Sequence, residues 1–459
     1  MATDLRLIGS NLKYERWRWQ IFFITWLAYA GFYLTRKSFS VAKIELMKPG
    51  AGTHGVGGGW SKGDLSWMDG AFLVAYAAGQ FCWGPLGDKL GTRKVIVWGM
   101  IASILTAVLM GATGTAFFFG LLFAVQGICQ STGWAPLTKN IGEFFSQRER
   151  GRVMGFWCSN YALGGLVASA LAGLAAQRLG WRAAFWVPAG VLFIIWLLFL
   201  LLQRNRPEDV GLSPIEQYHG EPEAVVEDDE TPVEEPEGSW KLIGAVFKNR
   251  MVLLLALVYL LLKPTRYLIM FWSPVYINER LGSGAAEAGI LGSMFDLAGP
   301  IAVLFGGYVS DKLFQSRRMP ISVMTLIGAA ILLSAFGFLP ATRLALGLGL
   351  FGIGFLLYIP DSLVSGTAAI DFGTKKGAST AAGFINGAGS VGAILGGTAP
   401  GWIGGGKGHD PWHVIFLGLG GTLALAAALL MPRWNELPPT GFAAPALDTA
   451  SAPSLAPEA

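Results

Sequence analysis

The chain has 459 residues, of which 53% are hydrophobic and only 14% are charged, and its net charge is +4. A soluble globular protein carries far more charge on its surface, so this composition excludes that class and predicts a membrane protein. The small net charge does not suggest nucleic acid as a partner. Cys82, Cys129 and Cys158 lie in separate apolar runs without metal-ligand spacing. We therefore expect packing cysteines, no metal and no cofactor.

Apolar runs of helical length follow one another along the chain, each long enough for a hydrocarbon core of ~30 Å. The amino end is polar and leads directly into the first run, which predicts an uncleaved membrane helix. Charged or Gly/Pro-rich breaks separate two sets of six predicted helices. The first set covers 19–47, 66–87, 94–112, 115–139, 152–177 and 183–203. The second set covers 250–278, 286–311, 320–339, 342–366, 377–402 and 411–431.

A polar segment separates the two sets of helices. It contains twelve acidic residues within 208–237 and several prolines, a composition that cannot bury a core and that predicts a flexible linker. The predicted organisation is a six-helix bundle (1–203), an acidic cytoplasmic linker (204–249), a second six-helix bundle (250–433) and a disordered Pro/Ala-rich tail (434–459). Lys and Arg are concentrated in segments on the linker side, so the positive-inside rule places both termini in the cytoplasm.

An acid–base motif occurs once in each half, at the predicted ends of helices 2 and 8. The first copy is Gly84-Pro-Leu-Gly-Asp88-Lys89-Leu-Gly91-Thr-Arg93-Lys94, and the second is Gly307-Tyr-Val-Ser-Asp311-Lys312. Six spans per half together with this repeat resemble the major facilitator superfamily. We interpret Asp88, Lys89, Arg93, Asp311 and Lys312 as a latch that pairs charges in one conformation and releases them in another. Ordinary positive-inside topology is the alternative, although it does not explain why the Gly–Asp spacing occurs twice.

Polar residues also form a stripe inside the first helix of each half. Ionisable groups in a bilayer cost several kcal/mol, so each of them is a candidate functional residue. The stripe in the first half, at helical spacing, is Tyr29, Tyr33, Arg36, Ser40 and Lys43. The stripe in the second half is Tyr259, Lys263, Arg266, Met270 and Ser273. The two arginines are 230 residues apart and occupy equivalent positions.

Two arginines that face each other would repel unless an anion lies between them. Guanidinium groups match phosphate oxygens in bidentate geometry, and a dianionic phosphate would neutralise both. The pattern therefore favours a phosphate site at Arg36 and Arg266. The alternative is that each arginine pairs with an acid inside the membrane, for which Glu45, Asp296 and Asp361 are available.

The helix 1 segment Tyr29-Ala-Gly-Phe-Tyr33-Leu-Thr-Arg36-Lys37-Ser-Phe39-Ser resembles the signature of the organophosphate:phosphate antiporters. Further matching segments include Gly133-Trp134-Ala-Pro136, Glu149-Arg150-Gly151-Arg152, Arg206-Pro-Glu-Asp-Val-Gly211, Phe271-Trp272-Ser-Pro274 and Asp371-Phe-Gly373-Thr-Lys375. The resemblance implies an all-α membrane protein with twelve transmembrane helices in two pseudo-symmetric six-helix bundles. It covers nearly the whole chain except the acidic linker and the two tails.

The resemblance also implies roles for individual residues. Arg36 and Arg266 match the phosphate-binding arginines of the family, Lys37 matches its Arg-Lys pair, and Tyr33 and Tyr76 match tyrosines that line its cavity.

The chain departs from the family where Gln80 replaces a lysine and Tyr161 replaces a histidine of the glycerol-3-phosphate branch. These departures disfavour glycerol 3-phosphate, and Tyr161 is a further candidate for binding. Lys263 is another candidate because it shares the Arg266 face, whereas Lys139 faces the cavity or lies at the cytoplasmic end. Asp296 and Asp361 are structural ion partners or groups that act on the substrate.

The predicted function is secondary antiport of a sugar phosphate or related metabolite against inorganic phosphate, by alternating access in the inner membrane. We expect a monomer that is not an enzyme and whose partners are the two substrates and the bilayer. One alternative is a non-transporting sensor of external hexose phosphate. The other is a proton-coupled symporter of organic anions, in which Glu45, Asp296 or Asp361 would titrate.

Overall fold

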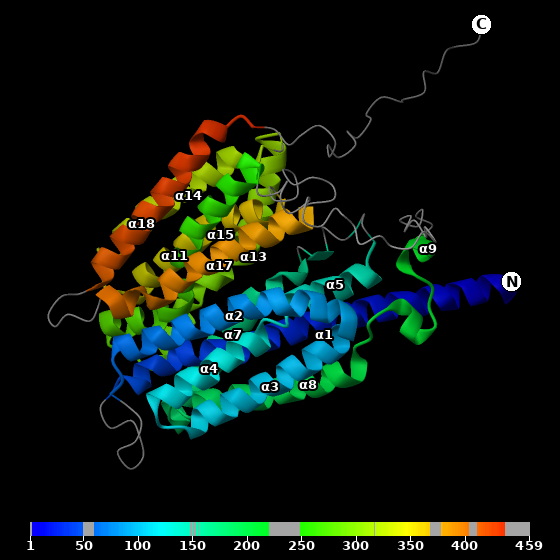
Figure 1. Cartoon of the computed structure of the whole chain (residues 1–459), viewed down its shortest axis with the longest axis horizontal. Coiled ribbons are helices and arrows are strands. Elements are labelled where there is room, and N and C mark those ends of the chain that lie inside the picture. The colour runs from blue at the N-terminus through cyan, green and yellow to red at the C-terminus, as the bar shows by residue number, and fades with distance from the viewer. Residues whose placement is uncertain are drawn as a thin grey trace, which may run out of the picture.

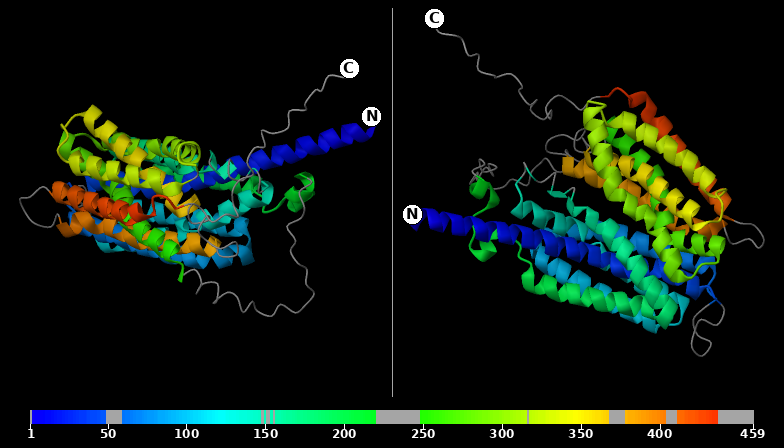
Figure 2. Two further views of the ribbon diagram at one scale, coloured as in Figure 1. Left: turned by 90° about the horizontal axis from the view of Figure 1, so that it is seen from above. Right: turned by 180° about the vertical axis from the view of Figure 1, so that it is seen from behind.

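The computed structural model describes residues 2–48, 59–146, 149, 153–154, 156–219, 248–315, 317–367, 378–403 and 411–436. All regular elements in these residues are helical, and they form two bundles (Figures 1 and 2). The first bundle contains α1 (Ala2–Leu46), α2 (Lys62–Leu90), α3 (Thr92–Ala112), α4 (Ala116–Gln130), α5 (Trp134–Phe144), α7 (Ser159–Leu179) and α8 (Ala183–Leu202). The second contains α11 (Arg250–Leu281), α12 (Ala285–Gly292), α13 (Met294–Lys312), α14 (Arg318–Phe336), α15 (Arg343–Ser362), α17 (Ala378–Ile403) and α18 (Pro411–Leu430).

Each of the twelve predicted spans corresponds to a helix or to a helix with a local irregularity. The fourth span breaks into α4 and α5 at residues 131–133, where the hydroxyl groups of Ser131 and Thr132 donate back to carbonyls in the last turn of α4. The eighth span breaks at Ser293, whose hydroxyl group donates to the Ile290 carbonyl at 2.7 Å. The tenth span ends in a π-helical turn, η3 (Leu363–Thr367). Such irregularities are frequent at functional sites.

The polar segments outside the spans contain more regular structure than the sequence predicts. Helix α1 begins at Ala2, far before the expected residue 19. The beginning of the predicted linker forms η2 (Pro207–Val210) and α9 (Ile215–His219). Tyr218 of α9 stacks on Tyr14 of α1 with 3.9 Å between ring centres, so α1 supplies a packing surface that composition alone does not reveal. The remainder of the linker and of the tail lies outside the described residues.

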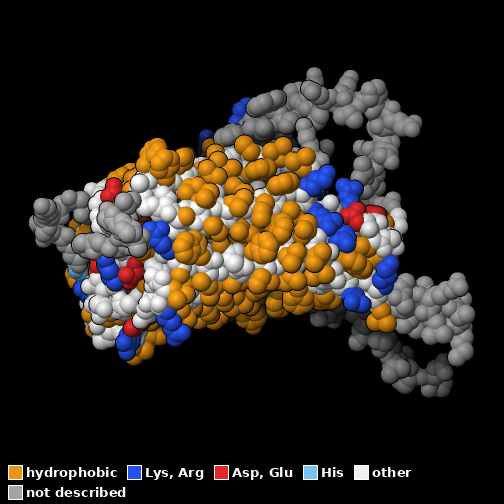
Figure 3. Space-filling view, turned by 90° about the horizontal axis from the view of Figure 1, so that it is seen from below, with side chains coloured by type: hydrophobic (Ala, Val, Ile, Leu, Met, Phe, Trp, Pro, Cys, Tyr) orange, Lys and Arg blue, Asp and Glu red, His pale blue; other side chains and the backbone are white. Residues whose placement is uncertain are grey.

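Hydrophobic side chains cover the outside of the bundles. Figure 3 shows a broad apolar band with basic and acidic side chains gathered at its two ends. Large apolar residues in this surface are well exposed, among them Trp98 (71%) and Ile331 (67%). Eight helices in the described part are long and apolar enough to cross a bilayer. A surface of this kind is stable against lipid and not against water.

The two bundles touch at one end of the molecule, which we call the far side. It comprises the ends of the spans next to Leu46–Lys62 and Leu281–Ala285. Ser40 donates to the Met270 carbonyl at 3.1 Å, and Lys62 Nζ lies 2.9 Å from Glu279 Oε1. Toward the other end, where the N-terminus lies, the two ribbon bundles diverge (Figure 1).

Candidate functional site: a buried basic cluster between the bundles

Arg36 lies in the middle of α1 and is 3% exposed. Its Nε donates to Gln130 Oε1 at 2.8 Å, and the Gln130 amide in turn donates to Thr35, which fixes the orientation of the amide. Its guanidinium carbon lies 4.7 Å and 4.8 Å from the ring centres of Tyr33 and Tyr76. One terminal nitrogen, NH2, is buried without a hydrogen-bond partner in the described part of the chain.

Arg266 lies at the equivalent position of α11 but has a different partner. Its NH1 lies 2.6 Å from Asp361 Oδ2, with side-chain exposures of 15% and 9%. The guanidinium carbon is 4.8 Å from the Tyr358 ring centre and 5.6 Å from that of Tyr161. One predicted alternative, pairing with an acid inside the membrane, is therefore seen for Arg266, whereas the hydrogen-bond partner of Arg36 is the neutral Gln130.

The partners of the two arginines are related by the internal repeat. Gln130 ends α4 and Asp361 lies near the end of α15, and 231 residues separate them, against 230 between the arginines. Each partner also lies directly before a helix irregularity. The two halves therefore build the same arrangement, an arginine on the first helix bound by a side chain on the fourth, with an amide in one half and a carboxylate in the other.

A second ion pair joins the two bundles beside the arginines. Lys37 Nζ lies 2.7 Å from Asp296 Oδ2, and both side chains are 3% exposed. Tyr358 donates to the other oxygen, Oδ1, of Asp296 at 3.1 Å, and its ring also contacts Arg266. Tyr33 interacts electrostatically with Arg36 and with Arg266. The structure thus brings the residues predicted on α1 and α11 into one network.

Lys263 completes the cluster. It is 6% exposed, and its Nζ lies 4.8 Å and 5.4 Å from the ring centres of Tyr259 and Tyr267. In the described residues it has no carboxylate partner within ion-pair distance. Among the residues that the structure describes, the cluster therefore holds two more basic than acidic side chains. Its basic members are Arg36, Lys37, Lys263 and Arg266, and its acidic members are Asp296 and Asp361.

Two polar features of this region are not evident from the sequence patterns. Gln130 was not predicted, although it is one of two glutamines, with Gln126, in an otherwise apolar helix. The pair of Lys43 and Asp69, 2.5 Å apart and fully buried on the far side, was not predicted either. Lys43 Nζ also donates to the Phe271 carbonyl at 3.1 Å and lies 4.0 Å from the Trp272 ring centre. A lysine three residues after Ser40 on the α1 stripe was the available signal for this pair.

Other predicted residues lie elsewhere. Lys139 is exposed on α5 and is not part of the cluster. Arg93 donates to the Leu200 carbonyl at 2.6 Å, within its own bundle, and Lys312 is exposed at the end of α13. The side chains of Asp88, Lys89 and Asp311 lie outside the described part of the structure.

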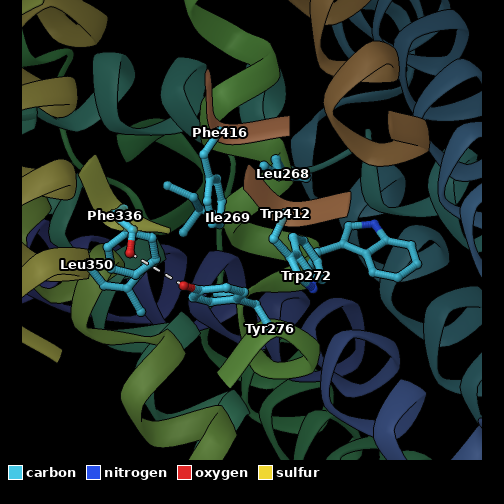
Figure 4. A pocket seen from close by; sticks show the side chains of 9 residues that line it. Leu268, Ile269, Trp272, Tyr276, Phe336, Leu350, Trp412 and Phe416 are labelled. Atoms are coloured by element: carbon cyan, nitrogen blue, oxygen red, sulfur yellow. Dashed lines mark hydrogen bonds between the residues drawn. The ribbon is translucent and has the colours of Figure 1, made fainter. Parts of the chain in front are cut away.

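A small pocket lies in the second bundle, toward the far side from Arg266, and is not a substrate site. It encloses about 10 Å³, enough for roughly one water molecule. Figure 4 shows apolar and aromatic side chains around it, with the Tyr276 hydroxyl donating to the Phe336 carbonyl at 3.4 Å. Its walls carry no charged group that could hold a phosphate. Its aromatic side chains come from α11, α14 and α18 and pack against one another.

The fold resembles solved transporters. A bacterial homolog of the human lysosomal transporter Spinster, in an inward-facing and unoccupied conformation, superposes with a TM-score of 0.67 at 15% identity, covering 91% of this chain and 95% of that one. Residues 21–369 match the model of the Major Facilitator Superfamily. The chain belongs to this superfamily: it is a multi-pass membrane protein with the major facilitator fold and not an enzyme.

Curated relatives define the family more closely. A probable hexose phosphate transport protein of Chlamydia trachomatis is 28% identical, with 94% of each chain covered. The glycerol-3-phosphate transporter of Bacillus subtilis is 29% identical over 94% of this chain and 96% of its own. The membrane sensor protein UhpC of Escherichia coli is 28% identical over 96% of this chain and 97% of its own. These relatives confirm the resemblance to the organophosphate:phosphate antiporter family.

Proposed function

We propose that the protein is a secondary antiporter that exchanges a sugar phosphate or related organic phosphate for inorganic phosphate. The observation that carries the proposal is an Arg36 nitrogen without a hydrogen-bond partner, in a buried cluster with an excess of two positive charges, both among the described residues. A phosphate dianion supplies acceptors for that nitrogen and compensates both charges. Buried donors and charges of this kind are costly without a partner, and charge-assisted bonds to phosphate are strong. The names of the relatives support the same substrate class.

Alternating access follows from the position of the cluster. The far-side contacts close one end of the molecule, and transport requires them to open while the other end closes around a midplane site. An empty cluster keeps its excess charge unscreened, which disfavours this rearrangement because both bundles must bring their cations together. Phosphate that enters from either side of the membrane screens this charge and so lowers the barrier to the rearrangement. Exchange without net phosphate flux is the consequence.

Proteoliposomes test this function directly. Vesicles loaded with inorganic phosphate should take up labelled phosphate, and a hexose 6-phosphate outside should compete, whereas empty vesicles should take up little. Vesicles containing Arg36→Ala serve as the control, since they retain the protein but lose the unpartnered donor. Equal uptake by loaded and empty vesicles would contradict the exchange mechanism and favour a symporter driven by a proton gradient.

A second candidate function is sensing. One relative that covers nearly the whole chain is named a membrane sensor, and a sensor would use the same phosphate site without completing the transport cycle. Phosphate binding to the purified protein combined with no exchange in proteoliposomes would identify this function.

The remaining assignments are proposals that extend this function. We place both termini in the cytoplasm and take 1–203 and 250–433 as bundles joined by the acidic segment 204–249, with 434–459 as a tail. We also propose a monomer, which light scattering in detergent would check.

The acid–base repeat at Asp88 and Asp311 is proposed as a latch, so Asp88→Asn should slow exchange and leave the binding constant nearly unchanged.

A further inference from the structure

Asp361 has one carboxylate oxygen that the protein leaves unused. Its Oδ2 is held by Arg266 at 2.6 Å, whereas Oδ1 is buried and has no hydrogen-bond partner among the described residues. A buried carboxylate oxygen without a donor costs free energy, and such groups are rare unless something outside the chain supplies the donor. Among the described residues of the cluster, Arg36 NH2 is thus a donor without a partner and Asp361 Oδ1 an acceptor without one. Asp296 Oδ2 also lacks a hydrogen bond, but it lies 2.7 Å from Lys37 Nζ in an ion pair.

The surroundings of Asp361 differ from those of Arg36 in access and in shape. Asp361 is 6% exposed against 3% for Arg36, and the Arg266 side chain beside it keeps 15% exposure. Tyr161 and Tyr358 lie beside Arg266 with their rings stacked, 6.1 Å between centres and 18° between planes. Aromatic faces beside an acceptor suit a molecule with apolar C–H groups and hydroxyl groups, because the rings cover the former and the acceptor orients the latter.

The charge of the cluster decides which donor fits. With two more basic than acidic side chains among the described residues, the cluster as a whole disfavours a further cation such as an ammonium group. A neutral hydroxyl group satisfies Oδ1 without adding positive charge. The equivalent residue Gln130 contacts Arg36 through a neutral amide, so at these two equivalent positions the carboxylate belongs to the second half.

We propose that Asp361 is a specificity-determining residue whose Oδ1 accepts a hydrogen bond from a hydroxyl group of the organic part of the substrate, while Arg36 binds its phosphate. The substrate class is then a polyhydroxylated organic phosphate, such as a sugar phosphate, and not an alkyl or acyl phosphate. This inference rests on the proposed function, since it assumes that a phosphate group occupies the Arg36 end of the cluster.

Binding to the purified full-length protein, measured by calorimetry, tests the assignment with two ligands of equal phosphate charge, a hexose 6-phosphate and ethyl phosphate. The readout is the ratio of their dissociation constants, because the loss of a negative charge in Asp361→Asn alters binding of both ligands alike. The wild type should prefer the hexose phosphate, and Asp361→Asn should reduce that preference about tenfold or more, as expected for a hydrogen bond to a charged acceptor. Ser365→Ala is the matched control: it removes a hydrogen bond of 2.6 Å to the backbone carbonyl of Asp361 and keeps the carboxylate, so it should leave the ratio unchanged.

Each other outcome has a definite meaning. A parallel change for both ligands in Asp361→Asn would overturn the assignment and leave Asp361 as an ion partner of Arg266. Tighter binding of an amino-sugar phosphate than of the hexose phosphate would overturn it in favour of an ammonium donor. If the variant does not fold, monodeoxy hexose 6-phosphates on the wild type decide: one analogue must bind about tenfold more weakly, and equal binding of all analogues overturns the proposal. A wild type that binds neither ligand would contradict the proposed function, whereas one that binds both equally contradicts only the role of Asp361.

Discussion

Arg36 and Arg266 occupy equivalent positions in the two halves, yet their surroundings differ. Arg36 is bound by an amide and keeps an unpartnered nitrogen, while Arg266 is already neutralised by Asp361. An arginine without a counter-ion gains more from a phosphate than one whose counter-ion must first be displaced or shared. The two residues should therefore contribute unequally to phosphate binding, although their positions in the sequence suggest equal roles.

Conservative substitutions should reveal this inequality. Arg36→Lys keeps the charge but loses the planar fork and should lose about 1.5–3 kcal/mol, or about 10- to 150-fold in affinity for inorganic phosphate. Arg266→Lys should lose less, because lysine can still pair with Asp361. Calorimetry with inorganic phosphate measures both. Gln130→Glu would give Arg36 a counter-ion as well and should weaken phosphate binding. Wild-type affinity in Arg36→Lys would show that Arg36 only holds α4 through Gln130.

Two prolines in α11, Pro264 and Pro274, leave backbone carbonyls of this helix open to neighbouring helices. Proline has no backbone N–H, so the carbonyl four residues earlier loses its partner within the helix. Pro264 frees the Leu260 carbonyl, against which α17 packs so closely that a Cβ at Gly392 would lie 2.1 Å from that oxygen. Pro274 frees the Met270 carbonyl, which accepts hydrogen bonds from α1. Each proline thus leaves one carbonyl of α11 without a partner in its own helix, and a neighbouring helix contacts that carbonyl.

Restoring the backbone N–H at position 274 should weaken the contacts between the bundles on the far side. In Pro274→Ala the new amide competes for the Met270 carbonyl, to which Ser40 and Lys37 now donate at 3.1 Å and 3.4 Å. A loss of about 1 kcal/mol should raise the population with an open far side about fivefold. Distances between spin labels at Ser61 and Leu281, in a background without the three cysteines, report this population. Pro264→Ala, which faces α17, should leave them unchanged, and an unaltered distribution in Pro274→Ala would contradict the role of Pro274.

The buried pair of Lys43 and Asp69 should behave as one unit. Removing either partner leaves an uncompensated charge in an apolar region, which costs about 3–5 kcal/mol, whereas replacing both by apolar residues is far less harmful. Lys43→Met and Asp69→Leu should each lower the thermal stability in detergent, and the double variant should recover more than half of the loss. Strictly additive losses would show that the 2.5 Å contact contributes no coupling.

At the scale of the whole molecule, the two bundles meet on the far side and diverge toward the N-terminus (Figure 1). The cross-bundle contacts of Ser40, Lys43 and Lys62 lie on this side, and the pair of Lys37 and Asp296 joins the bundles beside the arginines. These contacts close the far side, and they must break before the cluster can be reached from that side. If the two bundles rock against each other during transport, then transport should stop when the far-side contacts are fixed.

Cross-linking tests that expectation. Cysteines at Lys62 and Glu279, whose side chains are 2.9 Å apart, can be joined by a short bismaleimide in the background without native cysteines. Exchange should fall to the level of empty vesicles, while binding of phosphate from the end opposite the far side should persist. The same reagent on either single-cysteine variant is the control. Continued exchange in the cross-linked protein would mean that the far side need not open.

The order of the helices, their approximate bounds and the polar stripes of α1 and α11 follow from the sequence alone. Length, apolarity and helical spacing are local properties, and the lipid environment imposes them strongly on each segment. The internal repeat further predicted that Arg36 and Arg266 occupy equivalent places.

Which group satisfies each charge was decided only by the tertiary structure. Gln130, Asp296 and Asp361 lie between about 90 and 260 residues from the basic side chains they meet, and several acids were equally available by composition. Only the packing of α4, α13 and α15 against α1 and α11 selects the partners, because a hydrogen bond requires a particular distance and direction. Within the described part of the chain, the same packing leaves Arg36 NH2 and Asp361 Oδ1 without hydrogen-bond partners, a feature that no local pattern contains.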